Sequence, residues 1–200
     1  MNLLLFPLLR LFNAWFVFPS RNPALIRCLR PFIVGSKSIL DVGCSDGIVG
    51  HELAKEAGAT IQGCDVVLQP RCAIPVVRYD GRHLPFADNQ FDTVMIADVL
   101  HHDLEPIRVI AEALRVSSGR VIIKDHYWEN WRQKYTLHFF DWISNAPYGI
   151  SVPYNFQQPR QWDEMFRALE VTVEVNQRFK LFFHDPCTQV IFVISKANHA

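Results

Sequence analysis

The 200-residue sequence has no excess of charge of either sign, since 20 Lys and Arg balance 20 Asp and Glu. A chain without net charge has no overall field to attract nucleic acid or acidic lipid. Its aromatic residues have few interleaved Lys or Arg, which makes a poor stacking platform for bases, so we expect no nucleic-acid partner. Half of the residues are hydrophobic, enough to build the core of one domain.

Cysteine is sparse and has no framework pattern. The five cysteines, Cys28, Cys44, Cys64, Cys72 and Cys187, form no C-x-x-C motif and no paired spacing. This pattern gives neither a disulfide scaffold nor a set of zinc ligands. We therefore expect reduced thiols, a cytoplasmic location and no metal site.

Long uninterrupted hydrophobic runs are also missing, and the apolar N-terminus, MNLLLFPLLRLFNAWFVFPS, contains Pro7 and Arg10. It is too short and too interrupted for a spanning helix, and it lacks the early charge of a signal peptide. Three interpretations stay open: a packed helix over the functional site, an interfacial helix that makes peripheral membrane contact through residues 1–20, or a targeting or anchor segment. The nearby arginines suit anionic headgroups or a solvated face: Arg10, Arg21, Arg27 and Arg30.

Short apolar runs alternate with helical patterns from residue 38 onwards. Strands are predicted at 38–43, 60–66, 76–79, 91–99 and 120–124, with helices at 47–57 and 104–115. Asp103 is predicted to cap the second of these helices, with Pro106 in its first turn. A helix at 160–169 and strands at 171–179 and 189–195 follow. The alternation predicts an α/β fold with a parallel sheet, whose strand ends share one ligand-binding edge.

The turn after the first strand, DVGCSDG, limits what its ligand can be. No Lys follows the glycines as in a Walker A loop, and Gly43, Gly47 and Gly50 lack the spacing of a dinucleotide fingerprint. Asp41 at the strand end is a poor neighbour for a pyrophosphate. A carboxylate there suits a ligand that carries an ammonium or sulfonium group.

This turn resembles the first motif, D-x-G-x-G-x-G, of the class I S-adenosylmethionine-dependent methyltransferases, and specifically their small-molecule, type 11-like group. Asp41, Gly43 and Gly47 match the motif, whereas Ser45 replaces its middle glycine, so that the turn must accommodate a Cβ. The resemblance covers about residues 38–124. It implies a Rossmann-like three-layer sandwich with a mostly parallel seven-stranded sheet, the last strand antiparallel, and S-adenosyl-L-methionine as cofactor.

Three later stretches follow the same family's order. In IQGCDV, the resemblance implies that Asp65 accepts hydrogen bonds from the ribose hydroxyls; in RYDGRHLPF, it implies that Asp80 accepts from the adenine amino group. LPFADNQFDTVMIADVLHH resembles the stretch that passes beside the cofactor. The implied cofactor-binding residues are Asp41, Gly43, Cys44, Ser45, Gly47, Asp65, Val66, Asp80, Gly81, Arg82, Ala97 and Asp98.

Methyl transfer from a sulfonium needs an aligned acceptor, exclusion of water and, for some acceptors, a base. His126, in RVIIKDHYWENW, is the first candidate for that base, since imidazole titrates near neutral pH. Asp125 is the candidate to orient it, His102 is a second histidine candidate, and Asp141 a candidate partner of His126 or the acceptor. Loop bracing and packing are the structural alternatives for both histidines.

Aromatic residues are dense after residue 126 and include four of the five tryptophans. They predict a helical, aromatic-rich lid over an apolar acceptor site, with a second core layer as the alternative. We expect a single methyltransferase domain over residues 1–200, divided into an N-terminal helical segment at 1–34, a cofactor-binding core at 38–126, a lid at 127–170 and C-terminal strands at 171–196.

The predicted function is methylation, on O or C, of a small hydrophobic or aromatic acceptor in biosynthesis. One alternative is another reaction on the same fold. A second is a cofactor-binding or membrane-docked partner subunit without activity of its own. A nicotinamide dehydrogenase is a third alternative, which the glycine spacing disfavours.

Overall fold

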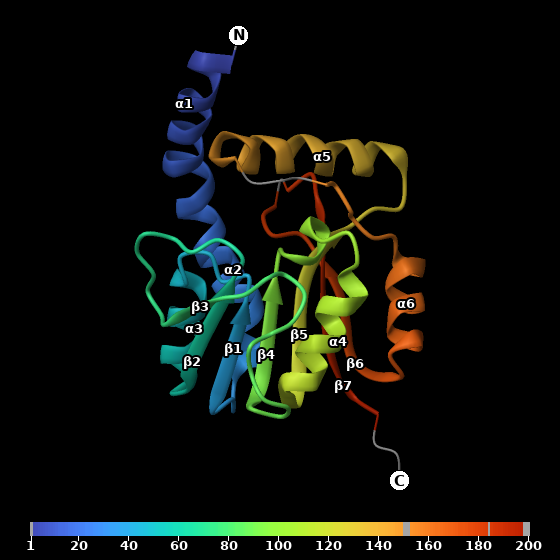
Figure 1. Ribbon diagram of the computed structural model, residues 1–200. Coiled ribbons are helices and arrows are strands. Elements are labelled where there is room, and N and C mark those ends of the chain that lie inside the picture. The colour runs from blue at the N-terminus through green and yellow to red at the C-terminus, as the bar shows by residue number, and fades with distance from the viewer. Residues whose placement is uncertain (1, 150–152, 184, 198–200) are drawn as a thin grey trace.

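A computed structural model describes residues 2–149, 153–183 and 185–197. Its centre is a seven-stranded sheet with the order β3-β2-β1-β4-β5-β7-β6 (Figure 1). Strands β1 to β5 pair in parallel, and β7 runs antiparallel to both of its neighbours. This topology confirms the predicted mostly parallel sheet of seven strands with an antiparallel last strand.

The bounds of the elements agree closely with the expected ones. The strands are β1 Ser38–Val42, β2 Thr60–Asp65, β3 Val76–Arg78, β4 Phe91–Ala97, β5 Ser117–Tyr127, β6 Val171–Phe179 and β7 Thr188–Lys196. The α-helices are α1 Asn2–Phe12, α2 Phe18–Ile33, α3 Ile48–Ala57, α4 Pro106–Val116, α5 Trp131–Asn145 and α6 Pro159–Ala168. A π-helical turn, Asn13–Val17, joins α1 to α2, and short 3-10 turns cover Leu100–His102 and Ala146–Tyr148.

Helices cover both faces of the sheet and make three layers. On one face, the apolar sides of α2 and α3 pack on alternate residues of the strands, with Leu29 and Leu53 against Ile39 and Ile122. On the other face, α4 and α6 pack on the intervening residues. Because both faces are covered, the central strands are apolar throughout rather than alternating with polar residues.

Two expectations about local structure are wrong. Strand β5 was expected to end at Lys124 but continues to Tyr127, because pairing with β7 extends to the Tyr127–Thr188 pair. Asp103 does not cap α4, since Glu105 occupies the N-cap position; the Asp103 side chain instead accepts the backbone N–H of Glu105 at 2.7 Å. Asp125, His126 and Tyr127 are therefore held in a strand and not in a loop.

The N-terminal segment is helical, as expected, but its two halves differ. Helix α2 packs on the sheet beside α3, whereas α1 rises beyond the end of the sheet (Figure 1). Helix α5 crosses that same end, and its C-terminal turn meets α1. Among the described residues, no helix combines the length and the hydropathy needed to cross a bilayer.

Candidate active site

The turn after β1 presents its backbone at the carboxyl edge of the sheet. Gly43 and Gly47 both have φ of +72°, a region that L side chains rarely adopt. A Cβ on Gly43 would lie 2.4 Å from Val99, and one on Gly47 would lie 2.6 Å from Ile74. Both glycines of the predicted motif are therefore required by conformation and by space.

The carboxylate of Asp41 lies directly before this turn and is buried. Burial, reinforced by the negative charges of Asp65 and Asp46, raises the pKa of Asp41 to about 7. No protein cation is among the causes of this shift. A carboxyl group in this state gains most from a ligand that brings a positive charge.

Ser45, the departure from the family motif, adopts a left-handed conformation with φ of +51°. The turn therefore keeps the conformation that glycine would favour and carries the extra Cβ. The backbone N–H of Ser45 donates to Asp65 Oδ2 at 2.8 Å, and that of Val67 donates to Oδ1 at 3.0 Å. These bonds fix the Asp65 carboxylate at the end of β2, next to the turn, and each oxygen keeps a further lone pair.

The segment after β3 is held as a tight turn. Asp80 Oδ1 accepts the backbone N–H groups of Arg82 and His83 at 2.8 and 2.9 Å, and these two bonds lower the pKa of Asp80. A Cβ on Gly81 would lie 3.4 Å from Val66, which follows β2. The structure thus brings the ends of β2 and β3 together. Cys44 is buried within the first turn, whereas Val66 and Arg82 are exposed.

Asp98 follows Ala97, the last residue of β4, and is bound by two cations. Its carboxylate pairs with the fully buried Lys124 ammonium and, at 2.6 Å, with Arg21 from α2. Burial alone would raise the pKa of Asp98, but Lys124 and then Arg21 outweigh burial and hold it below its ordinary value. Lys124 lies at the expected edge of the sheet but was assigned no role from the sequence, and Arg21 was not predicted to reach the site.

Among the described residues, His101 and Asp125 form the closest pair of a histidine and an acid, and His101 was not among the predicted site residues. His101 Nδ1 and Asp125 Oδ1 are 2.6 Å apart, and both side chains are buried. Burial opposes the charge on His101, but Asp125 outweighs it and raises the His101 pKa; the pKa of Asp125 is correspondingly held low against its burial. The adjacent histidines His101 and His102 were visible in the sequence. The 3-10 turn that contains them directs His101 into the interior.

His126 lies close to this pair but is not oriented by Asp125 as expected. Its Nδ1 is 3.7 Å from Asp125 Oδ1 and 3.5 Å from Asp98 Oδ1, whereas Asp125 Oδ1 accepts the backbone N–H of His126. The buried Nδ1 makes no hydrogen bond in the described part of the chain. Burial and the charge of Lys124 lower the pKa of His126, so the imidazole is neutral at pH 7.

Helix α5 brings Asp141 over the histidines. Asp141 Oδ1 lies 3.8 Å from His101 Nε2 and 4.0 Å from His102 Nε2, and it accepts a 2.6 Å hydrogen bond from Asn145. The Asp141 carboxylate therefore points inward, and Asn145, four residues later on α5, holds it. Asp141 faces His101 and His102, however, and no contact with His126 is among its ion pairs.

The aromatic residues after residue 126 divide into three groups. Phe156 stacks on His101 with ring centroids 4.6 Å apart and accepts, through its carbonyl, the indole N–H of Trp128. Trp162 and Phe166 belong to the core under α6, which is the structural alternative considered for them. Four rings of α5 face solvent: Trp131, Tyr135, Phe139 and Phe140.

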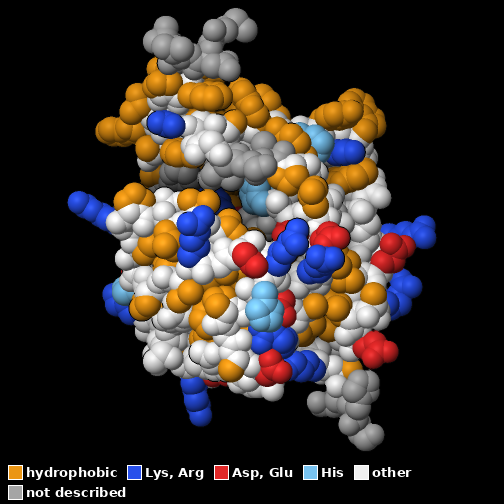
Figure 2. Space-filling model, viewed as in Figure 1, with side chains coloured by type: hydrophobic (Ala, Val, Ile, Leu, Met, Phe, Trp, Pro, Cys, Tyr) orange, Lys and Arg blue, Asp and Glu red, His pale blue; other side chains and the backbone are white. Residues whose placement is uncertain are grey.

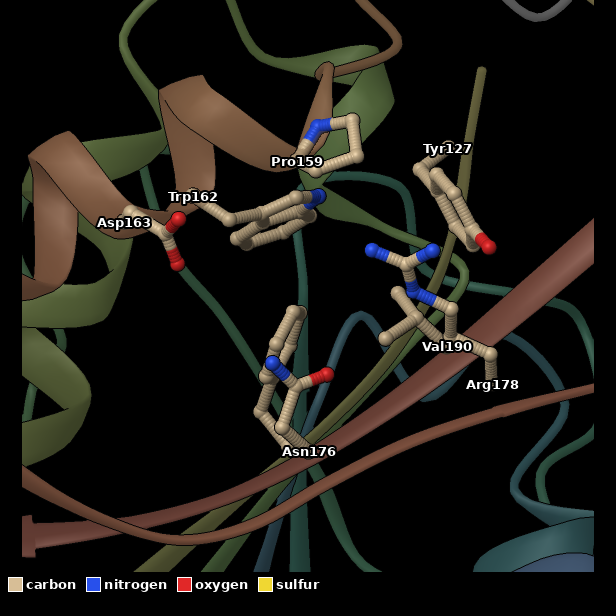
Figure 3. Close-up of a pocket in the computed structure, with 8 residues that line it drawn as sticks. Tyr127, Pro159, Trp162, Asp163, Asn176, Arg178 and Val190 are labelled. Carbon is tan, nitrogen blue, oxygen red and sulfur yellow. The ribbon is translucent and has the colours of Figure 1, made fainter. Parts of the chain in front are cut away.

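A small cavity lies between α6 and strands β5, β6 and β7, and none of the candidate site residues lines it. Its volume is about 50 Å³, and Tyr127, Trp162 and Arg178 line it (Figure 3). Ligand pockets are several times larger. The cavity therefore does not offer a second place for a cofactor or an acceptor.

Comparison with known proteins identifies residues 40–123 with the methyltransferase domain family. The chain is 27% identical over 138 residues to the ubiquinone/menaquinone biosynthesis C-methyltransferase UbiE of Cupriavidus pinatubonensis, covering 59% of this chain and 57% of that protein. It is 34% identical over 101 residues to a demethylmenaquinone methyltransferase of Paenarthrobacter aurescens, covering 46% and 39%. The chain thus spans about half the length of these relatives.

Solved structures share the fold at low sequence identity. A Haloferax volcanii methyltransferase, solved in complex with the Trm112 methyltransferase activator, has a TM-score of 0.71 at 15% identity and covers 94% of this chain and 97% of its own. The 1,6-didemethyltoxoflavin-N1-methyltransferase of Burkholderia thailandensis, solved with S-adenosylhomocysteine, has a TM-score of 0.66 at 15% identity, with 93% and 82% covered. Together, the first-motif turn, the sheet topology and the methyltransferase domain matched over residues 40–123 support a class I S-adenosylmethionine-dependent methyltransferase.

Proposed function

We propose that the chain transfers a methyl group from S-adenosylmethionine to oxygen or carbon of a small hydrophobic or aromatic acceptor. One observation carries the proposal: the buried Asp41 beside the glycine turn lies on the same sheet edge as His101, Asp125 and His126. A cofactor site and a set of acid–base groups therefore meet where ligands of such sheets bind.

The residues of the first half of the sheet fit this cofactor. Asp41, a buried carboxyl with a raised pKa, suits the positive amino-acid end, and the backbone of the turn from Gly43 to Gly47 is proposed to lie against it. Asp65, fixed by two backbone N–H groups, has lone pairs for two ribose hydroxyls. Asp80 and the backbone of Gly81 and Arg82 are proposed for the adenine. Cys44, Ser45, Val66 and Ala97 are proposed to line the same site.

Asp98 was expected to bind the cofactor, and we propose a different role for it. Because its carboxylate is paired with Lys124 and Arg21, we propose that it holds these cations beside the cofactor and does not bind the cofactor directly. A salt bridge between α2 and the end of β4 then closes one side of the site. Water would be excluded there by side chains from the N-terminal segment.

The bound cofactor supplies a methyl group on a sulfonium, which is displaced in line by the acceptor. We propose His126 as the base, because its imidazole is neutral at pH 7 and two carboxylates, Asp98 and Asp125, lie close enough to stabilise its protonated form. With its own proton on Nδ1, His126 Nε2 accepts the proton that the acceptor loses. His101, held by Asp125, positions this region, with Asp141 and His102 above it.

Helix α5 is proposed as the lid over the acceptor. Asp141 on this helix accepts a hydrogen bond from Asn145 and faces the histidines, and His138, also on α5, stacks with Phe156 at 6.1 Å between ring centroids. The names of the similar relatives refer to ubiquinone and menaquinone biosynthesis, whose products are hydrophobic rings. An apolar, hydroxylated ring is accordingly the acceptor class that we propose.

We also propose peripheral membrane contact through residues 1–20. The described apolar side chains of α1 and of the turn after it include several that are exposed: Leu5, Leu8, Leu11, Phe12 and Trp15. A helix of this kind rests on a bilayer surface instead of crossing it.

The function is tested by supplying the protein with S-adenosylmethionine labelled in its methyl group and a panel of quinols and phenols. We expect label in one class of acceptor, and a loss of at least about 100-fold in kcat for His126→Asn with cofactor affinity kept. Cofactor binding without transfer to any acceptor would favour the partner-subunit alternative. A product that contains no transferred methyl group would instead indicate another reaction on this fold.

A further inference from the structure

The end of the molecule formed by α1 and α5 is apolar on its outer surface. Trp15 is 73% exposed, Trp131 is 64% exposed and Leu8 is 62% exposed. Figure 2 shows hydrophobic side chains gathered over this end, where α1 and α5 lie in Figure 1. Scattered apolar residues are ordinary on a protein surface, but aromatic and aliphatic residues concentrated on two neighbouring helices mark an interaction surface.

The two helices are joined into one unit. Asn13, fully buried, donates from Nδ2 to the carbonyl of Ile143 in α5 at 3.0 Å. Arg10 donates to the carbonyl of Pro147 at 2.7 Å and lies over the ring of Tyr148. A ligand that holds α1 therefore holds the C-terminal end of α5 as well.

Cations lie beside the apolar side chains of α1 and α5. Helices α1 and α2 contain no Asp or Glu, and Arg10 on α1 and Arg21 near the start of α2 lie at this end. Helix α5 adds Arg132 and Lys134, and its one acid, Asp141, is turned inward with 6% of its side chain exposed. Apolar rings surrounded by cations complement an anionic bilayer surface, where aromatic residues occupy the headgroup level.

The β6–β7 connection extends the same surface. It leaves the sheet at the end where Tyr127 pairs with Thr188, which is also the end that α5 crosses. Phe183 in this connection is 94% exposed. Three separate segments of the chain thus present apolar side chains at one end of the molecule.

We infer that α1 and α5 together form a docking surface for an anionic lipid bilayer, so that the helix proposed as the lid is itself a membrane-binding element. This extends the contact beyond residues 1–20 and does not depend on which acceptor is methylated. Through Arg21, which follows α1 along the chain and pairs with Asp98, the docked segment is connected to the site.

The test is co-sedimentation of the full chain with phosphatidylcholine vesicles, with and without phosphatidylglycerol. We compare Leu8→Glu on α1 and Trp131→Glu on α5 with matched controls that add the same charge at exposed apolar positions of the opposite sheet end, Val34→Glu and Val173→Glu. We expect binding to the anionic vesicles that weakens with salt, and a loss of about tenfold or more for each of the two surface variants, with the controls unchanged.

Several results would overturn the inference. If Leu8→Glu abolishes binding and Trp131→Glu has no effect, α5 is not part of the surface. Equal binding to vesicles with and without phosphatidylglycerol would contradict the role of charge. A dimer in sedimentation velocity that Leu8→Glu dissociates, without vesicle binding by the parent chain, would show that a second copy covers this surface. Cofactor titration of the same samples reports separately whether the proposed function holds.

Discussion

His101 Nδ1 lies 2.6 Å from Asp125 Oδ1, and this contact joins the turn after β4 to the end of β5 beneath α5. Each partner stabilises the charged form of the other, since the pKa of His101 is raised and that of Asp125 is lowered. Both side chains are buried, so removal of one partner would leave a buried charge without its counterion and would destabilise the fold. The pair therefore fixes the position of the turn after β4 relative to the end of β5.

Asp125→Asn should lower the pKa of His101 and destabilise the fold by about 1–3 kcal/mol. Because the His101 pKa is raised on folding, the stabilisation from the pair is present below the unfolded value near 6.5 and is lost as pH rises through the folded value. The loss of stability in the variant should therefore be larger at pH 6 than at pH 9. Urea unfolding at both pH values measures it, with exposed Asp163→Asn as control.

Asp41→Asn should stabilise the ligand-free protein at pH 8 while it weakens cofactor binding. The pKa of Asp41 is raised from 3.8 to about 7, so ionisation of this buried group costs stability as pH rises through that range. The expected gain at pH 8 is about 2–4 kcal/mol. Thermal unfolding at pH 5 and pH 8 should show a larger gain at the higher value. An equal gain at both would contradict this assignment.

Lys124→Met should destabilise the fold by about 3–5 kcal/mol, because it removes the fully buried cation beside Asp98. The additional substitution Asp98→Asn should recover a large part of the lost stability, because the carboxylate that needs the Lys124 charge is then also removed. Arg21 tolerates this change because a third of its side chain is exposed. Chemical denaturation of the two single variants and the double variant measures the coupling, and additive losses would contradict a direct ion pair.

Ser45→Gly should leave cofactor affinity intact and raise stability by up to about 1 kcal/mol, because Ser45 holds φ at +51°. Asn89→Gly, at φ of +56° and outside the proposed site, is the matched control. A loss of affinity in Ser45→Gly alone would show that the serine side chain contributes to binding. Calorimetry and thermal unfolding of both variants measure these effects.

The arrangement of the residues that we propose for the cofactor could be predicted, because its determinants are local. A buried strand, a glycine turn and acids at the next two strand ends are all visible within residues 38–82. The acid–base half could not be predicted in the same way. Adjacent histidines look alike in sequence, and only the 3-10 turn distinguishes buried His101 from His102. Lys124 is buried because Asp98 and Arg21 reach it from other elements, and that pairing is long-range.

The most direct measurement is calorimetric titration of the protein with S-adenosylmethionine and with its demethylated product, repeated on Asp65→Ala and on the control Asp163→Ala. The account predicts saturable binding of both ligands in the micromolar range, about −8 kcal/mol, that Asp65→Ala weakens strongly and Asp163→Ala leaves unchanged. Absence of binding by the folded parent chain, or equal binding by the two variants, would contradict the proposed site.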